Sequence, residues 1–266
     1  MTIQQKISLN FMNKTKIGVC KLCKKTKDLT YEHIPPKSAY NRNTKFYRLE
    51  TTEYFKNAKQ YVEGILKPKS RKEQGGVGDY CLCENCNGYL GSKYVRDYKK
   101  LSDISYSIIS QYPVSKCYEY NISDVNLLKF IKQVIAIFIC SNNTDFTENH
   151  KGLIEFVLDE NSNNLPERYK VYMYLNDEGN IRSGNLTFTN LYGTICEFAF
   201  KPFGFVLSID NPNPIMELSN ITDFKKYNPS LKYKEIMIML NKYPTIFPFP
   251  MDYRSLDEIN NQPLIF

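Results

Sequence analysis

Two pairs of cysteines in the first hundred residues have the spacing of a metal site. Each pair forms a C-x-x-C motif, at residues 20–23 and 83–86. One such motif presents two sulfurs from a single tight turn, and zinc takes four thiolates in a closed tetrahedron. The sequence therefore predicts a structural zinc ion with four ligands, Cys20, Cys23, Cys83 and Cys86. Cys81 lies beside the second motif, and we expect it to pack in the core, with a ligand role as the alternative.

The segment between the two motifs is much longer than the roughly 15–20 residues of a simple zinc ribbon, and it holds groups suited to catalysis. Glu32 and His33 are adjacent in it, and Asn87 directly follows the second motif. A neutral histidine can take a proton from water near working pH. Mg²⁺ prefers oxygen ligands and needs only one or two from the protein. A base and such a cation are the parts needed to hydrolyse a phosphodiester.

The order of these motifs resembles that of the HNH or ββα-metal nucleases. The chain has a C-x-x-C motif, then Glu32-His33-Ile34-Pro35-Pro36-Lys37, and then C-x-x-C-N. The closest resemblance is to the subset in which two zinc knuckles clamp the motif, as in the endonuclease VII type, and it covers roughly residues 17 to 100. It implies that His33 is the general base and that Glu32 and Asn87 hold a catalytic Mg²⁺ or Mn²⁺. Two departures are visible: Glu32 stands where Asp is common, and Asn87 replaces the family's final His.

Positive charge is concentrated in the part of the chain that holds these motifs. The first hundred residues contain 21 Lys and Arg against 9 Asp and Glu, whereas the remainder contains 14 against 19. A basic face attracts polyanions by releasing condensed counterions, although Lys-rich surfaces are also often only solvated. We predict a nucleic-acid interface that contains Lys37, Lys67, Lys69, Arg71, Lys72, Lys93 and Arg96.

The pattern predicts an α+β fold with two domains. A zinc-stabilised ββα-metal domain is expected over residues 1–101 and a mixed α+β domain with an antiparallel β-meander over residues 102–266. In the first domain we expect strands at 29–34 and 45–55. A basic loop at 67–72 should run into a Gly-rich segment at 74–78 that faces DNA. A helix near 90–98 should be broken at Gly91.

In the second domain, Ser123 or Asp124 should cap a helix that ends near Cys140. Apolar residues cover nearly the whole circumference of this helix, so we expect it to be buried in a core or in a homodimer interface. A helix over 147–158 should leave His150 on the surface. Strands are expected at 170–175, 186–189, 194–200 and 205–209, with a further strand at 233–240 and a capped helix from Ser255. Cys117, Cys140 and Cys196 should be core residues.

The chain has no apolar run long enough for a signal peptide or a bilayer span, so we expect a soluble, cytoplasmic protein whose eight cysteines are reduced. We expect a metal-dependent endonuclease that cuts DNA, with RNA as an open alternative. By analogy with the family it would serve restriction or antiviral defence. Its second domain would serve regulation, by binding a ligand or partner, or substrate selection or oligomerisation. The competing hypotheses are a non-catalytic zinc module that binds nucleic acid and a structural or interaction protein.

Overall fold

The computed structural model describes residues 16–49, 56, 57, 60, 65–67, 69–227, 235–247 and 249–261. Its helices and antiparallel sheets place the chain in the predicted α+β class. Residues 50–55 of the expected strand at 45–55 lie outside the described residues. No helix within the described part of the chain is long and apolar enough to cross a membrane.

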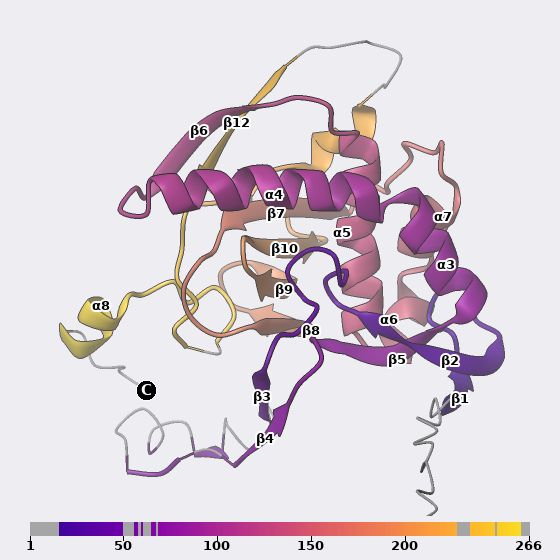
Figure 1. The fold of residues 1–266 in the computed structure, drawn as a ribbon, viewed down its shortest axis with the longest axis horizontal. Coiled ribbons are helices and arrows are strands. Elements are labelled where there is room, and N and C mark those ends of the chain that lie inside the picture. The colour runs from indigo at the N-terminus through magenta and orange to yellow at the C-terminus, as the bar shows by residue number, and fades with distance from the viewer. Residues whose placement is uncertain are drawn as a thin grey trace, which may run out of the picture.

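A three-stranded antiparallel sheet and one helix hold the motifs near the N-terminus (Figure 1). Strand β2 (Thr26–His33) lies between β1 (Lys16–Val19) and β5 (Gly78–Cys83), and it contains most of the strand expected at 29–34. Helix α3 (Glu84–Lys93) starts directly after β5, so the second C-x-x-C motif spans the junction between strand and helix.

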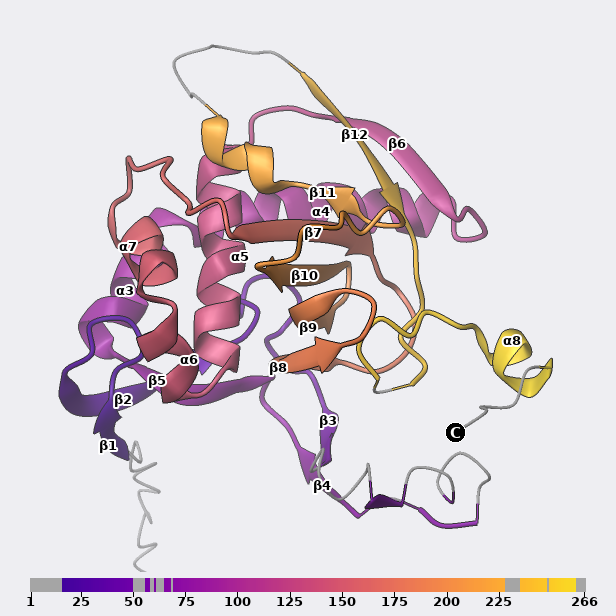
Figure 2. The same ribbon diagram turned by 180° about the vertical axis from the view of Figure 1, so that it is seen from behind.

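A two-stranded hairpin extends away from this sheet in both ribbon views (Figures 1 and 2). It pairs β3 (Phe46–Leu49) with β4 (Ser70–Glu73). The prediction of a basic loop at 67–72 is therefore partly wrong, because Arg71 and Lys72 lie on β4. Arginine and lysine are tolerated there because the strand is an exposed edge.

Helix α4 (Val95–Gln111) follows α3 after a break at Tyr94, not at Gly91 as predicted. A glycine inside a helix costs only about 1 kcal/mol and does not by itself end it. The break occurs where the buried Tyr94 hydroxyl donates to the carbonyl of Val157, 2.5 Å away. Tertiary packing therefore sets this boundary. Helix α4 also runs through residue 101, where the domain boundary is predicted.

Helix α5 (Leu127–Ser141) is the central element of the core. Its N-cap is Asn126, whose side chain accepts from the Lys129 amide, so the predicted caps at Ser123 or Asp124 are wrong. All its residues from Leu127 to Cys140 are buried except Lys129. Its apolar surface packs within this chain, so of the two predicted environments, a core or a homodimer interface, the structure shows the core.

Two short helices, α6 (Thr144–Asn149) and α7 (Lys151–Leu158), replace the single helix expected at 147–158. His150 lies between them, and it is buried with its Nδ1 3.0 Å from the hydroxyl of Tyr169. The prediction of a surface histidine is wrong because that hydroxyl supplies a partner distant in sequence.

A five-stranded antiparallel sheet forms the second half of the fold, in the order β11-β7-β10-β9-β8. Its strands are β7 (Tyr169–Leu175), β8 (Arg182–Thr189), β9 (Gly193–Phe200), β10 (Phe203–Ile209) and β11 (Ser219–Asn220). Strands β8, β9 and β10 form the predicted meander, whereas β7 pairs with β10 and not with β8. Tyr98 of α4 and Phe130 of α5 both contact the rings of Phe203 and Phe205, so the two helices pack against β10. Figure 2 shows α4 passing behind β7 and α5 beside the strands.

The remaining elements complete the edges of the molecule. The expected strand at 233–240 is β12 (Ile236–Asn241), which pairs with β6 (Cys117–Ile122) and not with the large sheet. Residues 233 and 234 lie outside the described residues. Cys117 is exposed on β6, so its expected core position is wrong. A 3₁₀ helix, η1, covers Thr222–Lys226, and α8 (Leu256–Asn261) starts at Ser255 with the predicted capping box.

One core joins the two halves of the chain. Buried residues of the small sheet, such as Leu22 and Leu82, belong to the same cluster as Phe130 of α5 and Phe205 of β10. The ring of Tyr98 on α4 stacks on Phe130 at 5.5 Å between centroids. The small sheet that carries the motifs therefore rests on the helices that cover the large sheet. The division of the chain into two domains at residues 101 and 102 stays a prediction.

Candidate functional site

Four cysteines come together where the first C-x-x-C motif meets the end of β5. The sulfurs of Cys20, Cys23, Cys83 and Cys86 all lie within 4.8 Å of one another. The Sγ atoms of Cys23 and Cys83 are 3.9 Å apart, too far for a disulfide and close to the roughly 3.8 Å expected across a tetrahedral zinc site. This cluster could bind zinc, with the four predicted ligands. Cys81 is buried outside it, and Cys140 and Cys196 are core residues as predicted.

The thiols of the cluster hydrogen-bond to one another and share their protons unevenly. A hydrogen bond from Cys86 is the main reason that the pKa of Cys20 falls to about 4. The same contact raises the pKa of Cys86. A compact set of thiols can release further protons only if a positive ion balances the charge, as zinc does. Since Cys83 caps α3 and Cys86 lies in its first turn, an ion here would fix α3 against β2 and β5.

The lysines of the first motif serve partly as internal anchors. Lys21 donates from Nζ to the carbonyl of Cys140 at 2.6 Å, at the end of α5. Lys24 donates to the hydroxyl of Thr147 on α6. These bonds attach the first C-x-x-C turn to the second half of the chain. Lys25 and Lys27 are exposed.

A hollow of about 570 Å³ opens beside the cysteine cluster, and it brings together the three predicted catalytic residues. We call it the His33 hollow. It is lined by Tyr31, Glu32, His33, Pro36, Lys37, Ser38, Arg42, Asn87, Gly91 and Val95. Glu32 and His33 end strand β2, and Asn87 comes from α3. Separate elements thus deliver a carboxylate, an imidazole and an amide to one cavity.

One ring nitrogen of His33 is occupied by the backbone. Its Nε2 lies 3.1 Å from the carbonyl oxygen of Gly75, and a carbonyl can only accept. Nε2 therefore carries the proton, and Nδ1 has its lone pair free in the neutral ring. Burial lowers the pKa of His33 from its ordinary value, an effect that the bond to Gly75 partly opposes. The histidine is thus poised to accept a proton through Nδ1.

The Gly-rich segment holds this histidine in place. Tyr31, whose ring contacts His33 edge-on at 5.3 Å, donates its hydroxyl to the carbonyl of Gly76 at 3.0 Å. Gly76 has φ +105°, and a Cβ there would lie 2.7 Å from Cδ2 of His33. The Gly-rich segment at 74–78, which we predicted to face DNA, thus approaches the His33 ring closely at Gly76.

Glu32 presents an isolated carboxyl group to the hollow. The residue is only 8% exposed, and its carboxyl has no hydrogen bond or ion pair with any described residue. Burial raises the pKa of Glu32 to about 7. A buried carboxyl without a partner is costly when ionised, unless a cation is bound beside it.

Asn87 is oriented by Thr30 of β2. Thr30 donates its hydroxyl proton to the carbonyl of Leu82 at 3.1 Å, so its oxygen can only accept from Asn87. The Asn87 side chain therefore presents Nδ2 to Thr30 at 3.0 Å. Its Oδ1 is left for the hollow that Asn87 lines. An oxygen ligand for a hard cation is thus available beside Glu32.

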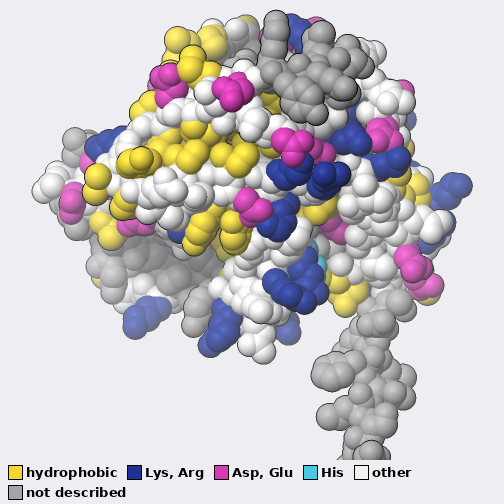
Figure 3. Space-filling view, turned by 45° about the horizontal axis from the view of Figure 1, so that its top comes forward, with side chains coloured by type: hydrophobic (Ala, Val, Ile, Leu, Met, Phe, Trp, Pro, Cys, Tyr) yellow, Lys and Arg dark blue, Asp and Glu magenta, His cyan; other side chains and the backbone are white. Residues whose placement is uncertain are grey.

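The structure separates the predicted nucleic-acid contacts into three groups. Lys37 lines the His33 hollow. Lys67, Lys69, Arg71, Lys72 and Arg96 are exposed away from that lining. Lys93 is paired with Glu160 at 2.6 Å, so its charge is largely compensated. In Figure 3, Lys and Arg side chains gather on one face around a histidine.

Sequence reasoning missed Arg42, Thr30 and the Gly75 carbonyl. Arg42 stands in the sequence Tyr40-Asn41-Arg42-Asn43, which has no recognisable spacing relation to His33. The loop after β2 folds back and brings Arg42 to the same hollow. The only signal was the Pro-rich turn after His33, which marks the start of a shaped loop.

Comparison with protein-family models, with curated proteins and with solved structures found no match to this chain.

Proposed function

We propose that the chain is a metal-dependent endonuclease of the HNH type, with the His33 hollow as its active site. The observation that carries this proposal is the hydrogen bonding of His33 and Asn87. The bond to Gly75 frees Nδ1 of His33, and the bond to Thr30 frees Oδ1 of Asn87. Both free atoms belong to residues that line the hollow, where Glu32 has no partner among the residues that the structure describes. A structural protein or a simple binding module needs none of these arrangements.

Each residue has a distinct task in this proposal. His33 takes a proton from water at Nδ1, while Gly75 keeps the ring in the required tautomer. Glu32 and Asn87 would hold a hard divalent cation, Mg²⁺ or Mn²⁺, through one carboxylate and one amide oxygen. Such a cation, when bound, supplies Lewis-acid stabilisation of the scissile phosphate and of the leaving oxygen. Lys37 and Arg42 attract the phosphate backbone.

The cysteine cluster has a structural task. Zinc bound by Cys20, Cys23, Cys83 and Cys86 would close the junction of β5 and α3 and so fix Asn87 relative to β2. Held by four thiolates, the ion would leave no coordination position for water, as expected of a structural zinc. Catalysis and zinc content are therefore separable by mutation.

The test is cleavage of supercoiled plasmid in Mg²⁺ or Mn²⁺ by the wild type and by His33→Ala. We expect wild-type cleavage and a loss of at least about 100-fold in the variant, because general-base catalysis contributes about 10²–10⁴-fold. Zinc content and circular dichroism of the variant should match the wild type. His150→Ala is the matched control. That histidine lies between α6 and α7, is buried against Tyr169 and does not line the hollow.

Equal cleavage by wild type and His33→Ala would contradict the proposed site. Salt-sensitive binding of DNA with no cleavage by the wild type would support the alternative of a non-catalytic zinc module. Loss of zinc from His33→Ala would show that the substitution disturbs folding, so that its loss of cleavage could not be assigned to the base. Glu32→Gln would then replace it in the comparison.

A further inference from the structure

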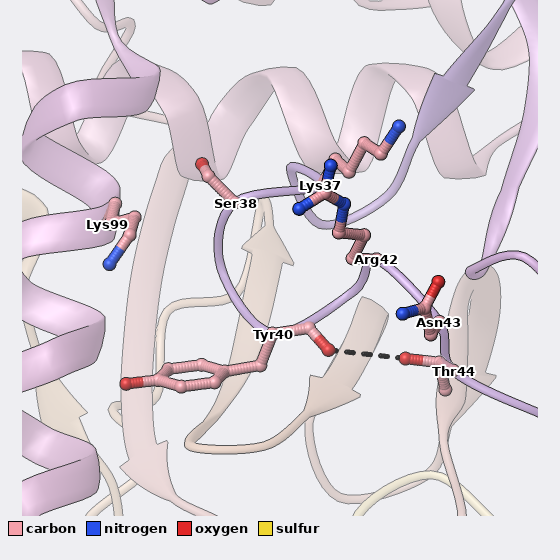
Figure 4. A pocket seen from close by; sticks show the side chains of 7 residues that line it. All are labelled: Lys37, Ser38, Tyr40, Arg42, Asn43, Thr44 and Lys99. Carbon is pink, nitrogen blue, oxygen red and sulfur yellow. Dashed lines mark hydrogen bonds between the residues drawn. The ribbon is translucent and has the colours of Figure 1, made fainter.

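A second hollow, of about 560 Å³, adjoins the His33 hollow. We call it the Tyr40 hollow. It lies between the loop after β2 and helix α4, and it is lined by Lys37, Ser38, Tyr40, Arg42, Asn43, Thr44 and Lys99 (Figure 4). Lys37, Ser38 and Arg42 line both hollows, so these two spaces meet at one wall. A volume of this size is ordinary for a small-ligand site.

The loop that forms this wall, residues 35–44, is held in place by the buried side chain of Asn41. Asn41 is fully buried, and its Nδ2 donates to the carbonyls of Pro35 and Val77, each at 2.7 Å. Its Oδ1 accepts from the amide of Val77, also at 2.7 Å. One side chain therefore ties residues 35–44 to the segment that orients His33. The two hollows are held in a fixed relation by this bond set.

Tyr40 forms an aromatic wall of the second hollow. One face of its ring stacks on Tyr106 of α4, with centroids 4.5 Å apart and planes 21° apart. Its hydroxyl donates to Asp103 at 2.8 Å, which fixes the ring further. The residue is nevertheless 42% exposed and lines the hollow.

The backbone at Tyr40 is held in an unfavourable conformation. Its φ is +65°, in the left-handed region that costs a non-glycine residue roughly 1–2 kcal/mol. Such residues persist when the surroundings over-determine them, and they cluster at functional sites. Here the hydroxyl bond to Asp103 and the stack on Tyr106 supply that restraint.

The shared wall carries positive charge without a compensating group. Lys37 and Arg42 are exposed, and neither has an ion pair within the described residues. Lys99, across the hollow, is paired with Asp103 at 2.5 Å and contributes less. A ligand in the Tyr40 hollow would thus meet an aromatic face on one side and two free cations where the hollow opens toward His33.

We infer that the Tyr40 hollow binds the nucleotide that flanks the scissile phosphate, with its base on the ring of Tyr40 and its phosphate at Lys37 and Arg42. A base in an intact duplex is stacked on both sides and cannot offer a face to a side chain, whereas an unpaired base can. The substrate class is therefore a strand that is single-stranded or locally open beside the cut. This inference rests on the proposed function.

The test maps cleavage of an end-labelled single strand that contains one abasic residue. The abasic residue keeps the backbone and removes one base, so at one offset from the cut it removes the base that would stack on Tyr40. We expect cleavage by the wild type to fall about tenfold or more at one fixed offset from the abasic residue, the size of one base–aromatic stack. DNA and RNA strands of the same sequence form separate arms, which identifies the sugar that is accepted.

Two variants make the contact specific. Tyr40→Asn removes the ring, and asparagine tolerates the left-handed backbone conformation. Cleavage by this variant should not fall at the offset where wild-type cleavage falls. Tyr40→Phe keeps the ring and should retain the wild-type pattern. A purely structural role for Tyr40 would lower cleavage at every position by the same factor and leave the pattern intact, which would overturn the inference.

Failure of the inference is distinguishable from failure of the proposed function. If the abasic residue changes cleavage at no offset, the chain is still a nuclease, but the proposed contact between the base and Tyr40 is refuted. If no strand is cut at all, a strand carrying 2-aminopurine provides the readout. Fluorescence quenching by wild type and Tyr40→Phe, but not by Tyr40→Asn, would support the base site alone, and equal behaviour of all three would refute it.

Discussion

At the scale of single residues, the state of Glu32 has a measurable consequence for stability. Burial raises the pKa of this carboxyl from its ordinary value to about 7 when no cation lies beside it. The folded protein therefore binds the Glu32 proton more tightly than the unfolded chain does. Stability from this group is fully present below the unfolded pKa and is lost as the pH rises through about 7.

We predict that Glu32→Gln changes the pH dependence of unfolding in buffer stripped of free divalent ions. The variant should match the wild type in stability near pH 4, where Glu32 is protonated in both the folded and the unfolded protein. Near pH 8 it should be the more stable protein, by about 3 kcal/mol at most, because glutamine cannot ionise. Urea unfolding at both pH values checks this.

Two additions sharpen this measurement. Glu119→Gln, at an exposed site on β6, should leave the pH dependence unchanged. Added Mg²⁺ or Mn²⁺ should stabilise the wild type at pH 8 but not Glu32→Gln, because only ionised Glu32 binds the cation. Equal stability of the wild type and Glu32→Gln at pH 8 would contradict an uncompensated Glu32.

The residues that sequence analysis found and missed differ in one respect. The four cysteines, Glu32, His33 and Asn87 stand at recognisable spacings, and the structure brings them together in one cysteine cluster and one hollow. Thr30, Asn41 and Arg42 act through partners that the tertiary fold supplies. No local pattern marks a threonine that must accept from an asparagine located 57 positions later.

At the scale of elements, the turn between β4 and β5 provides a pair of matched glycines. Gly75 and Gly76 have φ of +99° and +105°. A Cβ on Gly75 would meet nothing within 4 Å. A Cβ on Gly76 would lie 2.2 Å from the Asn41 carbonyl and 2.7 Å from the His33 ring. Backbone strain and steric collision can therefore be separated by one substitution each.

We predict that Gly75→Ala lowers the free energy of unfolding by about 1–2 kcal/mol and largely preserves cleavage, since it alters only the backbone preference. Gly76→Ala should cost more stability and lower cleavage about 100-fold, because His33 must move and a displacement near 1 Å can have that effect. Urea unfolding and plasmid cleavage measure both. Equal cleavage by the two variants would show that the turn does not position His33.

Element types were easier to predict than element boundaries. The sequence alone was enough to recognise helix α5 and the strands β8, β9 and β10, because burial dictates their composition. The break at Tyr94 and the split at His150 depend on partners in other elements, Val157 and Tyr169. Pairing of β7 with β10 and of β6 with β12 is likewise set by the whole fold.

At the scale of the whole molecule, a buried ion pair lies far from the cysteine cluster in sequence and links β8 to β9. Arg182 and Glu197 contact each other at 2.7 Å with side chains 4% and 1% exposed. Glu197 also accepts from the hydroxyls of Tyr174 and Tyr253. Tyr174 belongs to a second buried cluster, on the opposite face of β9 and β10 from the core that joins the two halves. Because β9 and β10 contribute residues to both clusters, we expect damage here to reach the small sheet through the large sheet.

We predict that Glu197→Gln lowers the unfolding free energy by about 3–5 kcal/mol, because it leaves Arg182 buried without a counter-charge. Zinc release should move to lower urea together with the loss of circular dichroism, since one core joins both halves. Asp210→Asn, in the exposed pair with Arg168, should cost at most about 1 kcal/mol. Zinc release that stays at the wild-type urea concentration in Glu197→Gln would indicate independent domains.

The cysteine cluster also has a consequence for how the protein is made. Cys20 and Cys83 meet across 63 positions of sequence, and Lys21 is anchored to Cys140, which leaves the ribosome much later. At about 5–20 residues per second, the first cysteine pair waits several seconds for its partners during synthesis. His33 waits equally long for Asn87. A nascent chain that ends before Asn87 therefore lacks the assembled hollow, so under the proposed function the growing polypeptide cannot cut nucleic acid, including its own messenger, until this part has been translated.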